Sequence, residues 1–135
     1  MLEVRGLKVS YGGINAVKGV NLDVAEGELV TLIGANGAGK TTTLKALAGL
    51  LRPAAGRIHY NGIDITARPA FELVRQGLAL VPEGRGVFGR LTVEENLAMG
   101  AYSRRDRAGI AVDFDRVYGL LPRLAERRRQ PGGTL

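Results

Sequence analysis

The chain has no cysteine and a single histidine, and its apolar residues never form a long uninterrupted run. Without cysteine, neither a disulfide framework nor a cysteine-based metal site can form, which suits a reducing compartment. No apolar run approaches the roughly 18 residues that a membrane-spanning helix needs. The first residues, MLEVRGLKVSYGG, also lack the pattern of a signal peptide. We therefore expect a soluble protein with no direct membrane span, which a partner must hold if it works at a membrane.

Positive charge exceeds negative charge, since 19 lysine and arginine residues face 13 acids and leave a formal net charge of +6. Such an excess could indicate a nucleic-acid or anionic membrane partner. The basic residues are mostly arginines scattered among acids, however, and no RNA- or DNA-binding motif accompanies them. The sequence therefore predicts no nucleic-acid partner. Its 135 residues suit one domain with a modest core.

Five segments have the pattern of β-strands. Apolar and polar residues alternate where one face would be buried, and short apolar runs predict strands that are more fully buried. The predicted strands are residues 2–9, 17–24, 29–33, 57–60 and 78–81. A turn signal at Gly12-Gly13 separates the first two, and Asn61-Gly62 closes the fourth.

The predicted helices cover residues 41–50, residues 69–76, a stretch from residue 92, a stretch from 113 to 120, and a stretch to about 129. Pro69 suits the first position of its helix. Thr92 opens the third helix, where Glu95 three residues later completes a capping box. Asp113 is expected to cap the fourth helix, and Pro122 separates that helix from an arginine-rich one.

Residues 34–41 read Gly-Ala-Asn-Gly-Ala-Gly-Lys-Thr and match the G-x-x-x-x-G-K-[ST] pattern of a phosphate-binding loop. Glycines let successive backbone N–H groups point at an anion without a Cβ clash, and the following helix adds its positive dipole end. We expect the Lys40 ammonium to reach the β- and γ-phosphates of ATP, and the Thr41 hydroxyl to ligate Mg²⁺. The predicted nucleotide-binding residues of this segment are Gly34, Ala35, Asn36, Gly37, Ala38, Gly39, Lys40, Thr41 and Thr42.

Three segments carry a family pattern around this loop: Tyr11-Gly12-Gly13, the Ala-Val-Lys-Gly-Val run of residues 16–20, and GANGAGKTT of residues 34–42. Together they resemble the start of an ABC-transporter ATPase subunit. The resemblance implies that Tyr11 stacks on the adenine and that Val17 lines the base pocket. A flat aromatic face suits the first role because it gains stacking energy at little ordering cost.

The resemblance also implies the fold class, which is α/β. The chain would be the N-terminal part of an ABC-type P-loop NTPase. It would contain an antiparallel β portion, RecA-like core strands and the start of a helical subdomain. We expect residues 1–135 to form a single, C-terminally incomplete ATP-binding domain. About 1–90 would be the β portion and nucleotide-binding core, and about 91–135 the helical subdomain.

Two further segments narrow the resemblance: VPEGR of residues 81–85 and LTVEENL of residues 91–97. They look like the ATPase of a high-affinity branched-chain amino-acid importer. Most ABC ATPases have a glutamine where Glu83 stands, and that glutamine contacts Mg²⁺ and the attacking water. A carboxylate can also ligate Mg²⁺, so our hypothesis is that Glu83 keeps the metal-contacting role.

The loop that begins at Glu83 and ends at Arg90 would, by the resemblance, face the transmembrane permease subunit. Val87 and Phe88 are apolar residues in this loop, and exposed apolar residues often mark a docking surface. The alternative is that they pack locally onto their own helix. A second ATP-binding subunit is also implied as a partner. The complete protein would be cytoplasmic and peripheral on the inner face of the plasma membrane.

The chain ends where the signature motif of the family would begin, with Leu135 as its first residue. The hydrophobic run ending in Asp-Glu and the switch histidine of the family are not in this chain, so its classification as an enzyme is uncertain. No complete set of catalytic residues is predicted; Lys40 is a phosphate contact. We expect nucleotide binding without useful hydrolysis, and steady Mg²⁺-ATP turnover abolished by Lys40→Ala would contradict this expectation.

The leading interpretation is thus the ATP-binding subunit of an ABC importer that energises uptake of branched-chain amino acids. One alternative is a nucleotide-binding interaction module without catalysis. Another is the ATPase of a related urea or amide importer, because other subunits recognise the solute. A GTPase is disfavoured, since the N-K-x-D guanine motif is absent.

Overall fold

The computed structural model describes residues 1–37, 39–84 and 86–135, with the Tyr11 side chain left out. The predicted roles of Ala38 and Arg85 therefore lie outside the described residues. The chain contains two compact units, residues 1–80 and residues 81–135.

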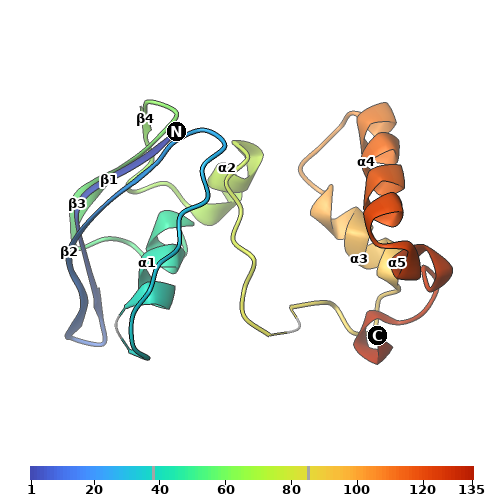
Figure 1. Ribbon diagram of the computed structural model, residues 1–135, viewed down its shortest axis with the longest axis horizontal. Helices are drawn as coiled ribbons and strands as arrows, with labels where there is room; N and C mark the ends of the chain where they lie inside the picture. The colour runs from blue at the N-terminus through green and yellow to red at the C-terminus, as the bar shows by residue number, and fades with distance from the viewer. Residues whose placement is uncertain (38, 85) are drawn as a thin grey trace. The chain divides into compact units, whose positions relative to one another are not determined.

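The N-terminal unit is built on an antiparallel sheet with strand order β2-β1-β3-β4 (Figure 1). Its strands are β1 (Leu2–Tyr11), β2 (Ile14–Val24), β3 (Ala55–Tyr60) and β4 (Ile63–Asp64). The first three confirm the predicted strands 2–9, 17–24 and 57–60, each a little longer than expected. Both predicted turns are present, and Asn61 and Gly62 at the second have φ of 50° and 78°. Such values suit a two-residue hairpin turn.

The alternation of β1 is interrupted once, and the structure shows why. Val4 and Leu7 are both fully buried although they lie three positions apart, an odd spacing that would put them on opposite faces of a regular strand. The pairing with β2 shifts between these two residues, so that the extra residue returns the next apolar side chain to the core. Gly6 sits in this irregularity with a φ of 57°, and its N–H donates to Asn21 Oδ1 at 2.7 Å.

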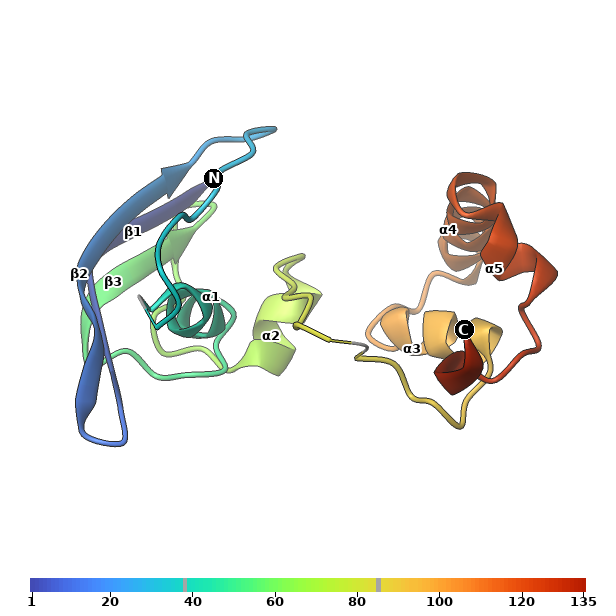
Figure 2. The same ribbon diagram turned by 60° about the horizontal axis from the view of Figure 1, so that its bottom comes forward.

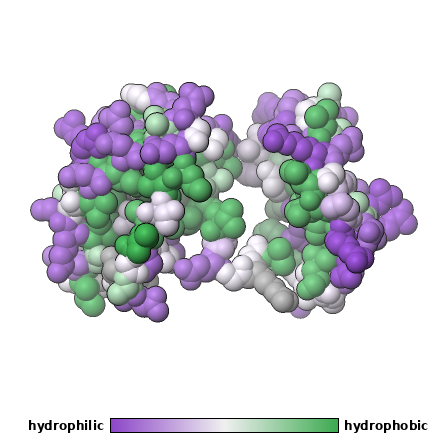
Figure 3. All heavy atoms as spheres, in the orientation of Figure 1, coloured by the Kyte–Doolittle hydropathy of each residue, from purple (hydrophilic) through white to green (hydrophobic). Residues whose placement is uncertain are grey.

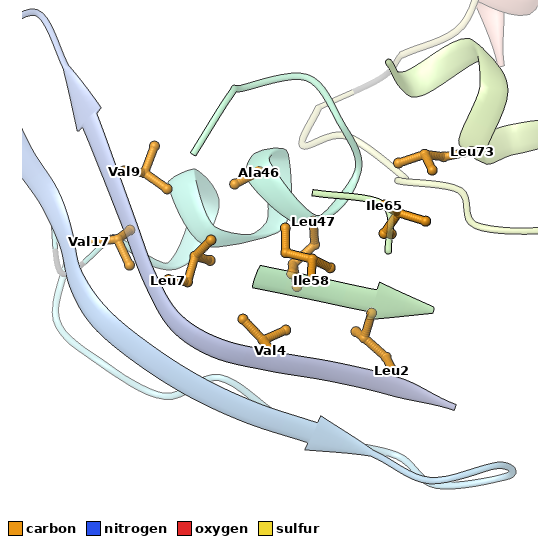
Figure 4. Packing of buried hydrophobic residues seen from close by; sticks show 10 residues of the cluster. All are labelled: Leu2, Val4, Leu7, Val9, Val17, Ala46, Leu47, Ile58, Ile65 and Leu73. Carbon is orange, nitrogen blue, oxygen red and sulfur yellow. The ribbon is translucent and has the colours of Figure 1, made fainter. Parts of the chain in front are cut away.

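Helix α1 (Lys40–Leu47) lies inside the curve of this sheet and contacts β1 and β2 (Figure 2). The core forms between them, and apolar residues of β3 and of the chain after β4 complete it (Figure 4). The buried apolar residues of this cluster are Leu2, Val4, Leu7, Val9, Val17, Ala46, Leu47, Ile58, Ile65 and Leu73. The packing holds the start of α1 at a fixed place on the sheet.

Helix α2 (Ala70–Arg75) follows the sheet and confirms the prediction for residues 69–76. Pro69 is its N-cap residue, one position before the place expected for it. Leu73 is only 1% exposed and joins the core cluster, while Phe71 and Val74 stay on the surface. Leu73 therefore anchors this short helix to the core.

Two predicted strands are wrong. Residues 29–33 and residues 78–81 have neither strand nor helix in the part of the chain that the structure describes. Leu29 and Ile33 are each 93% exposed and Val81 is 90% exposed, so the apolar pattern is real but unburied. A strand needs a neighbour for its N–H and C=O groups, and no described strand pairs with either segment. Figure 3 shows apolar residues, in green, reaching the surface of the N-terminal unit.

The C-terminal unit is helical. It comprises α3 (Val93–Gly100), α4 (Arg107–Leu120), α5 (Pro122–Glu126) and the 3₁₀ turn η1 (Gly132–Thr134). The break at Pro122 is confirmed, and the arginine-rich helix ends at Glu126 rather than near residue 129.

The predicted capping box at the start of α3 is confirmed. The Thr92 hydroxyl accepts from the Glu95 N–H at 3.2 Å, and the Thr92 N–H donates to Glu95 Oε2 at 2.7 Å. These reciprocal bonds satisfy two backbone donors that the helix itself leaves without partners.

The predicted cap at Asp113 is wrong. Helix α4 begins six residues earlier, with Asp106 at the N-cap position, so Asp113 lies inside the helix. The Asp113 carboxylate instead accepts from the guanidinium of Arg104, which also donates to Asp106 at 2.9 and 2.5 Å. The bonds from Arg104 lower the pKa of Asp106.

Among the described residues, no helix combines the length and the apolar character that crossing a bilayer requires.

The capping box predicts a specific pH dependence. Hydrogen bonds from the Thr92 backbone and hydroxyl hold the pKa of Glu95 below its ordinary value. The box therefore contributes stability above the ordinary glutamate pKa and loses it as the pH falls through the lowered one. Glu95→Gln keeps an oxygen acceptor but does not titrate. We expect its free energy of unfolding, from urea titrations between about pH 7 and 3, to fall less on acidification than that of the unmodified chain.

Glu94→Gln is the matched control, since Glu94 is exposed in the same turn and is not the residue bonded to Thr92. Parallel pH profiles for Glu95→Gln and the unmodified chain would contradict the assigned role of Glu95.

Candidate functional site

The glycine-rich loop enters α1 directly. Gly34, Ala35, Asn36 and Gly37 are exposed, whereas Gly39 is buried at the N-cap position of the helix. The helix begins at Lys40, within one residue of the predicted range 41–50, and ends at Leu47, three residues before the predicted end. Residues 34–37 are thus open to solvent, and the loop is fixed at its base by Gly39.

Gly39 is the point at which this base is fixed. Its φ is 86°, in the left-handed region that favours glycine. A Cβ at this position would lie 2.5 Å from the Ala16 carbonyl oxygen and 3.3 Å from Val17 Cγ2, both on β2. No side chain fits there, so the helix start lies directly against the strand.

Thr43 binds the carbonyl oxygen of Gly39 through two hydrogen bonds. Its hydroxyl donates to the Gly39 oxygen at 2.9 Å, and its backbone N–H donates to the same oxygen at 2.8 Å. Thr43 is only 4% exposed, and its hydroxyl is satisfied by this bond. The sequence reasoning missed this residue. Its signal was a threonine four positions after a left-handed glycine, a spacing that allows such a bond in a helix.

Lys40 folds back over the loop. Its ammonium donates to the carbonyl oxygens of Gly34 at 2.6 Å and Ala35 at 2.7 Å. The positive charge therefore lies beside the mouth of the loop and contacts neutral oxygens. An anionic oxygen would bind an ammonium more strongly than these carbonyls do. The arrangement can accept a phosphate group by exchanging one set of oxygen partners for another.

The other predicted residues occupy different places. Thr41 is exposed and Thr42 half-buried in the first turn of α1. Val17 is 4% exposed and belongs to the core beneath the loop, with little surface left for a ligand. Tyr11 is the last residue of β1, and its side chain lies outside the described residues. Glu83 is exposed in the C-terminal unit.

In the part of the chain that the structure describes, no group of three or more His, Cys, Asp or Glu side chains could hold a metal ion. Mg²⁺ usually keeps several waters and binds through few protein oxygens together with phosphate oxygens. The hydroxyl of Thr41 suits such a partial ligand set, because it is exposed at the start of α1.

The C-terminal unit has a surface hollow of about 420 Å³. Val81, Pro82, Gly84, Gly86, Val87, Gly132 and Leu135 line it. Val87 is 47% exposed and Phe88 57% exposed, which confirms that both stand on the surface of their loop. The loop of residues 83–90 thus carries two apolar side chains, Val87 and Phe88, that are accessible from solvent.

Comparison with known proteins gives the family context of this site. A family model described as ABC transporter matches residues 17–131. The high-affinity branched-chain amino acid transport ATP-binding protein BraG of Pseudomonas aeruginosa is 47% identical to all 135 residues of the chain, which cover 58% of BraG. The probable branched-chain amino acid transport ATP-binding protein LivF of Archaeoglobus fulgidus is 32% identical over the whole chain, which covers 57% of LivF. The chain thus spans less than two thirds of these relatives.

Solved structures agree with these matches. An ATP binding subunit of an ABC transporter shares 35% identity with a TM-score of 0.80 over 97% of this chain and 54% of its own. A nucleotide-free ATP-binding cassette from an ABC transporter shares 23% identity with a TM-score of 0.77, covering 100% of this chain and 58% of its own. The second likeness concerns the fold alone. Together they confirm the predicted α/β class of an ABC-type ATPase.

The contact at Gly39 gives a matched pair of glycine substitutions. Gly37 has a similar φ of 84°, but a Cβ there would meet no described heavy atom within 4 Å. We expect Gly37→Ala to cost about 1–2 kcal/mol through its left-handed backbone. Gly39→Ala adds the clash with Ala16, so its loss should be larger by about 1–3 kcal/mol. Urea unfolding of both variants measures the difference, and equal losses would contradict the close approach.

Proposed function

The chain belongs to the ABC transporter family, and on this premise we propose that it is the ATP-binding part of an importer for branched-chain amino acids. Two relatives that match its whole length are named as branched-chain amino acid transport ATP-binding proteins. A putrescine transport ATP-binding protein, PotG of Escherichia coli, is 34% identical over 97% of the chain, which covers 34% of PotG. The higher identity to BraG favours a branched-chain amino acid over putrescine.

One observation carries the nucleotide-binding role: the Lys40 ammonium lies against the Gly34 and Ala35 carbonyls of its own loop. The charge is already at the loop and is held by neutral partners that an anion can replace. Gly39 and Thr43 meanwhile fix the helix start behind it. Residues 34–37 and 39–42, with Ala38 between them, would hold the phosphates of ATP through backbone N–H groups, the ammonium and the first turn of α1.

Thr41 and Glu83 are the proposed protein ligands of Mg²⁺. Both offer oxygen atoms, which this cation prefers, and both are exposed. The bound cation would neutralise charge on the phosphates. Tyr11 and Val17 are the proposed contacts of the adenine; for Val17, which is mostly buried, this leaves only an edge contact.

The proposed partners are permease subunits, reached through the loop of residues 83–90, and a second ATP-binding subunit. The exposure of Val87 and Phe88 supports the first, because apolar side chains at a loop tip favour docking. We infer that the complete protein is cytoplasmic and peripheral on the inner face of the plasma membrane. We also propose that residues 1–135 belong to one ATP-binding domain.

Replacing Lys40 tests the phosphate site. A fluorescent ATP analogue titrated into the chain with Mg²⁺ should bind saturably and be displaced by ATP better than by GTP. Lys40→Ala removes charge-assisted hydrogen bonds of about 1.5–3 kcal/mol, so we expect affinity to fall about 10- to 100-fold.

Lys45→Ala is the matched control, since Lys45 is an exposed lysine in the last turn of the same helix. It should bind the analogue as the unmodified chain does. Failure of a demonstrably folded chain to bind, or equal affinity in the Lys40 and Lys45 variants, would contradict the proposal.

The metal role of Glu83 has its own test in the same titration. We expect Mg²⁺ to strengthen analogue binding less in Glu83→Ala than in the unmodified chain, and Glu83→Gln to keep part of the effect through its amide oxygen. Glu94→Ala, another exposed acid of the C-terminal unit, serves as control. The same Mg²⁺ dependence in all four proteins would remove Glu83 from the ligand set.

A further inference from the structure

The side chain of Asn96 on α3 makes an unusual number of hydrogen bonds to backbone. Its Oδ1 accepts from the Phe88 N–H at 2.8 Å. Its Nδ2 donates to the carbonyl oxygens of Phe88 at 3.0 Å, Leu91 at 3.2 Å and Thr92 at 2.9 Å. The amide oxygen thus accepts one bond, and the two N–H groups of the NH₂ are shared among three carbonyl oxygens. Asn96 therefore fixes the path of residues 88–92.

A second set of bonds joins this loop to the segment before the chain end. The Gly132 N–H donates to the Leu91 oxygen at 2.8 Å, and the Gly133 N–H donates to the Gly89 oxygen at 3.1 Å. The Leu91 oxygen thus accepts from both Gly132 and Asn96. A bridge between Thr92 and Pro131 continues the pairing.

Gly132 is where the two sets meet. It is buried, and a Cβ there would lie 2.9 Å from Asn96 Nδ2 and 3.5 Å from the Phe88 oxygen. The segment can approach the amide this closely only with glycine at that position. The backbone of Phe88 is bonded to the Asn96 amide, whereas Phe88 as a whole is 57% exposed.

We propose that Asn96 is a positioning residue that makes residues 88–91 and 130–133 one rigid element. A displacement of the Phe88 tip is then passed to the segment of residues 130–133 through shared hydrogen bonds. Only the identity of what displaces the tip, a permease subunit, rests on the proposed function. The link itself is a property of the hydrogen-bond network in the C-terminal unit.

The chemistry of the amide explains why asparagine suits this place. Aspartate would keep the acceptor for the Phe88 N–H but would set a charged oxygen against three carbonyl oxygens. The repulsion and the loss of the donors would break the bonds to the carbonyl oxygens of Phe88, Leu91 and Thr92, while the bond from the Phe88 N–H would remain. Asn96→Asp is therefore a sharp probe of the link.

Native-state amide hydrogen exchange, followed by NMR on the whole chain, tests the proposal. In Asn96→Asp we expect exchange at Gly132 and Gly133 to rise at least about tenfold, although neither N–H bonds to Asn96 itself. The amides of α4 provide the internal measure that the unit stays folded. Faster exchange at residues 88–92 with no change at Gly132 and Gly133 would overturn the proposal, because Asn96 would then act only locally.

Asn21→Asp is the matched control. In the N-terminal unit the Oδ1 of Asn21 accepts from the Gly6 N–H at 2.7 Å, and the substitution keeps that acceptor. Exchange at Gly132 and Gly133 should stay as in the unmodified chain. The same increase in this control would contradict a specific role of Asn96.

The reverse experiment keeps the test valid if Asn96→Asp unfolds the unit. Gly132 has no left-handed φ, so Gly132→Ala adds only a methyl group directed at the Asn96 amide. A real link acts in both directions. We expect faster exchange at the Phe88 amide, which bonds to Asn96 and not to Gly132. Unchanged exchange at Phe88 would overturn the proposal.

Discussion

The close approach of Gly39 to the Ala16 carbonyl is the constraint on which the nucleotide site depends. Because no Cβ lies between helix and strand, the start of α1 rests directly on β2. The core on the same face of the sheet keeps the helix in place, and Thr43 fixes the Gly39 carbonyl that ends the loop. A loop that is exposed and glycine-rich thus acquires a fixed base, and preorganisation of this kind lowers the cost of binding an anion.

Each of the two units is stabilised internally by a different kind of interaction. In the N-terminal unit, apolar side chains of the sheet, of α1 and of α2 form a common core. Among the described residues of the C-terminal unit, Val93 is the buried apolar residue, at 3% exposure. Its polar contacts include the Thr92–Glu95 box, the Arg104 ion pairs and the Asn96 network. Directional bonds of this kind define a single loop path more than they add stability.

In the exposed apolar segments, the structure differs from what the local sequence pattern predicts. Residues 29–33 have the composition of a buried strand, yet Leu29 and Ile33 are almost fully exposed. Apolar pattern reports a tendency to be buried, whereas a strand also needs a hydrogen-bonding neighbour. β1 pairs with β2, the next strand in the chain, and with β3, which lies further along it. Among the described residues, no strand pairs with residues 29–33 or 78–81.

The sequence by itself determined the features that depend on local chemistry. The phosphate-loop motif, the start of α1 at Lys40, the Asn61-Gly62 turn, the Thr92–Glu95 box and the break at Pro122 all follow from residues a few positions apart. The cap predicted at Asp113 shows the limit of such local prediction. Helix α4 begins at Arg107, and the Asp113 carboxylate accepts a hydrogen bond from Arg104, nine residues earlier. Only the tertiary structure decided which strands pair, that Gly39 touches β2, and that Asn96 joins two loop segments. These contacts bring together residues far apart in sequence, and composition and periodicity carry no information about such distances.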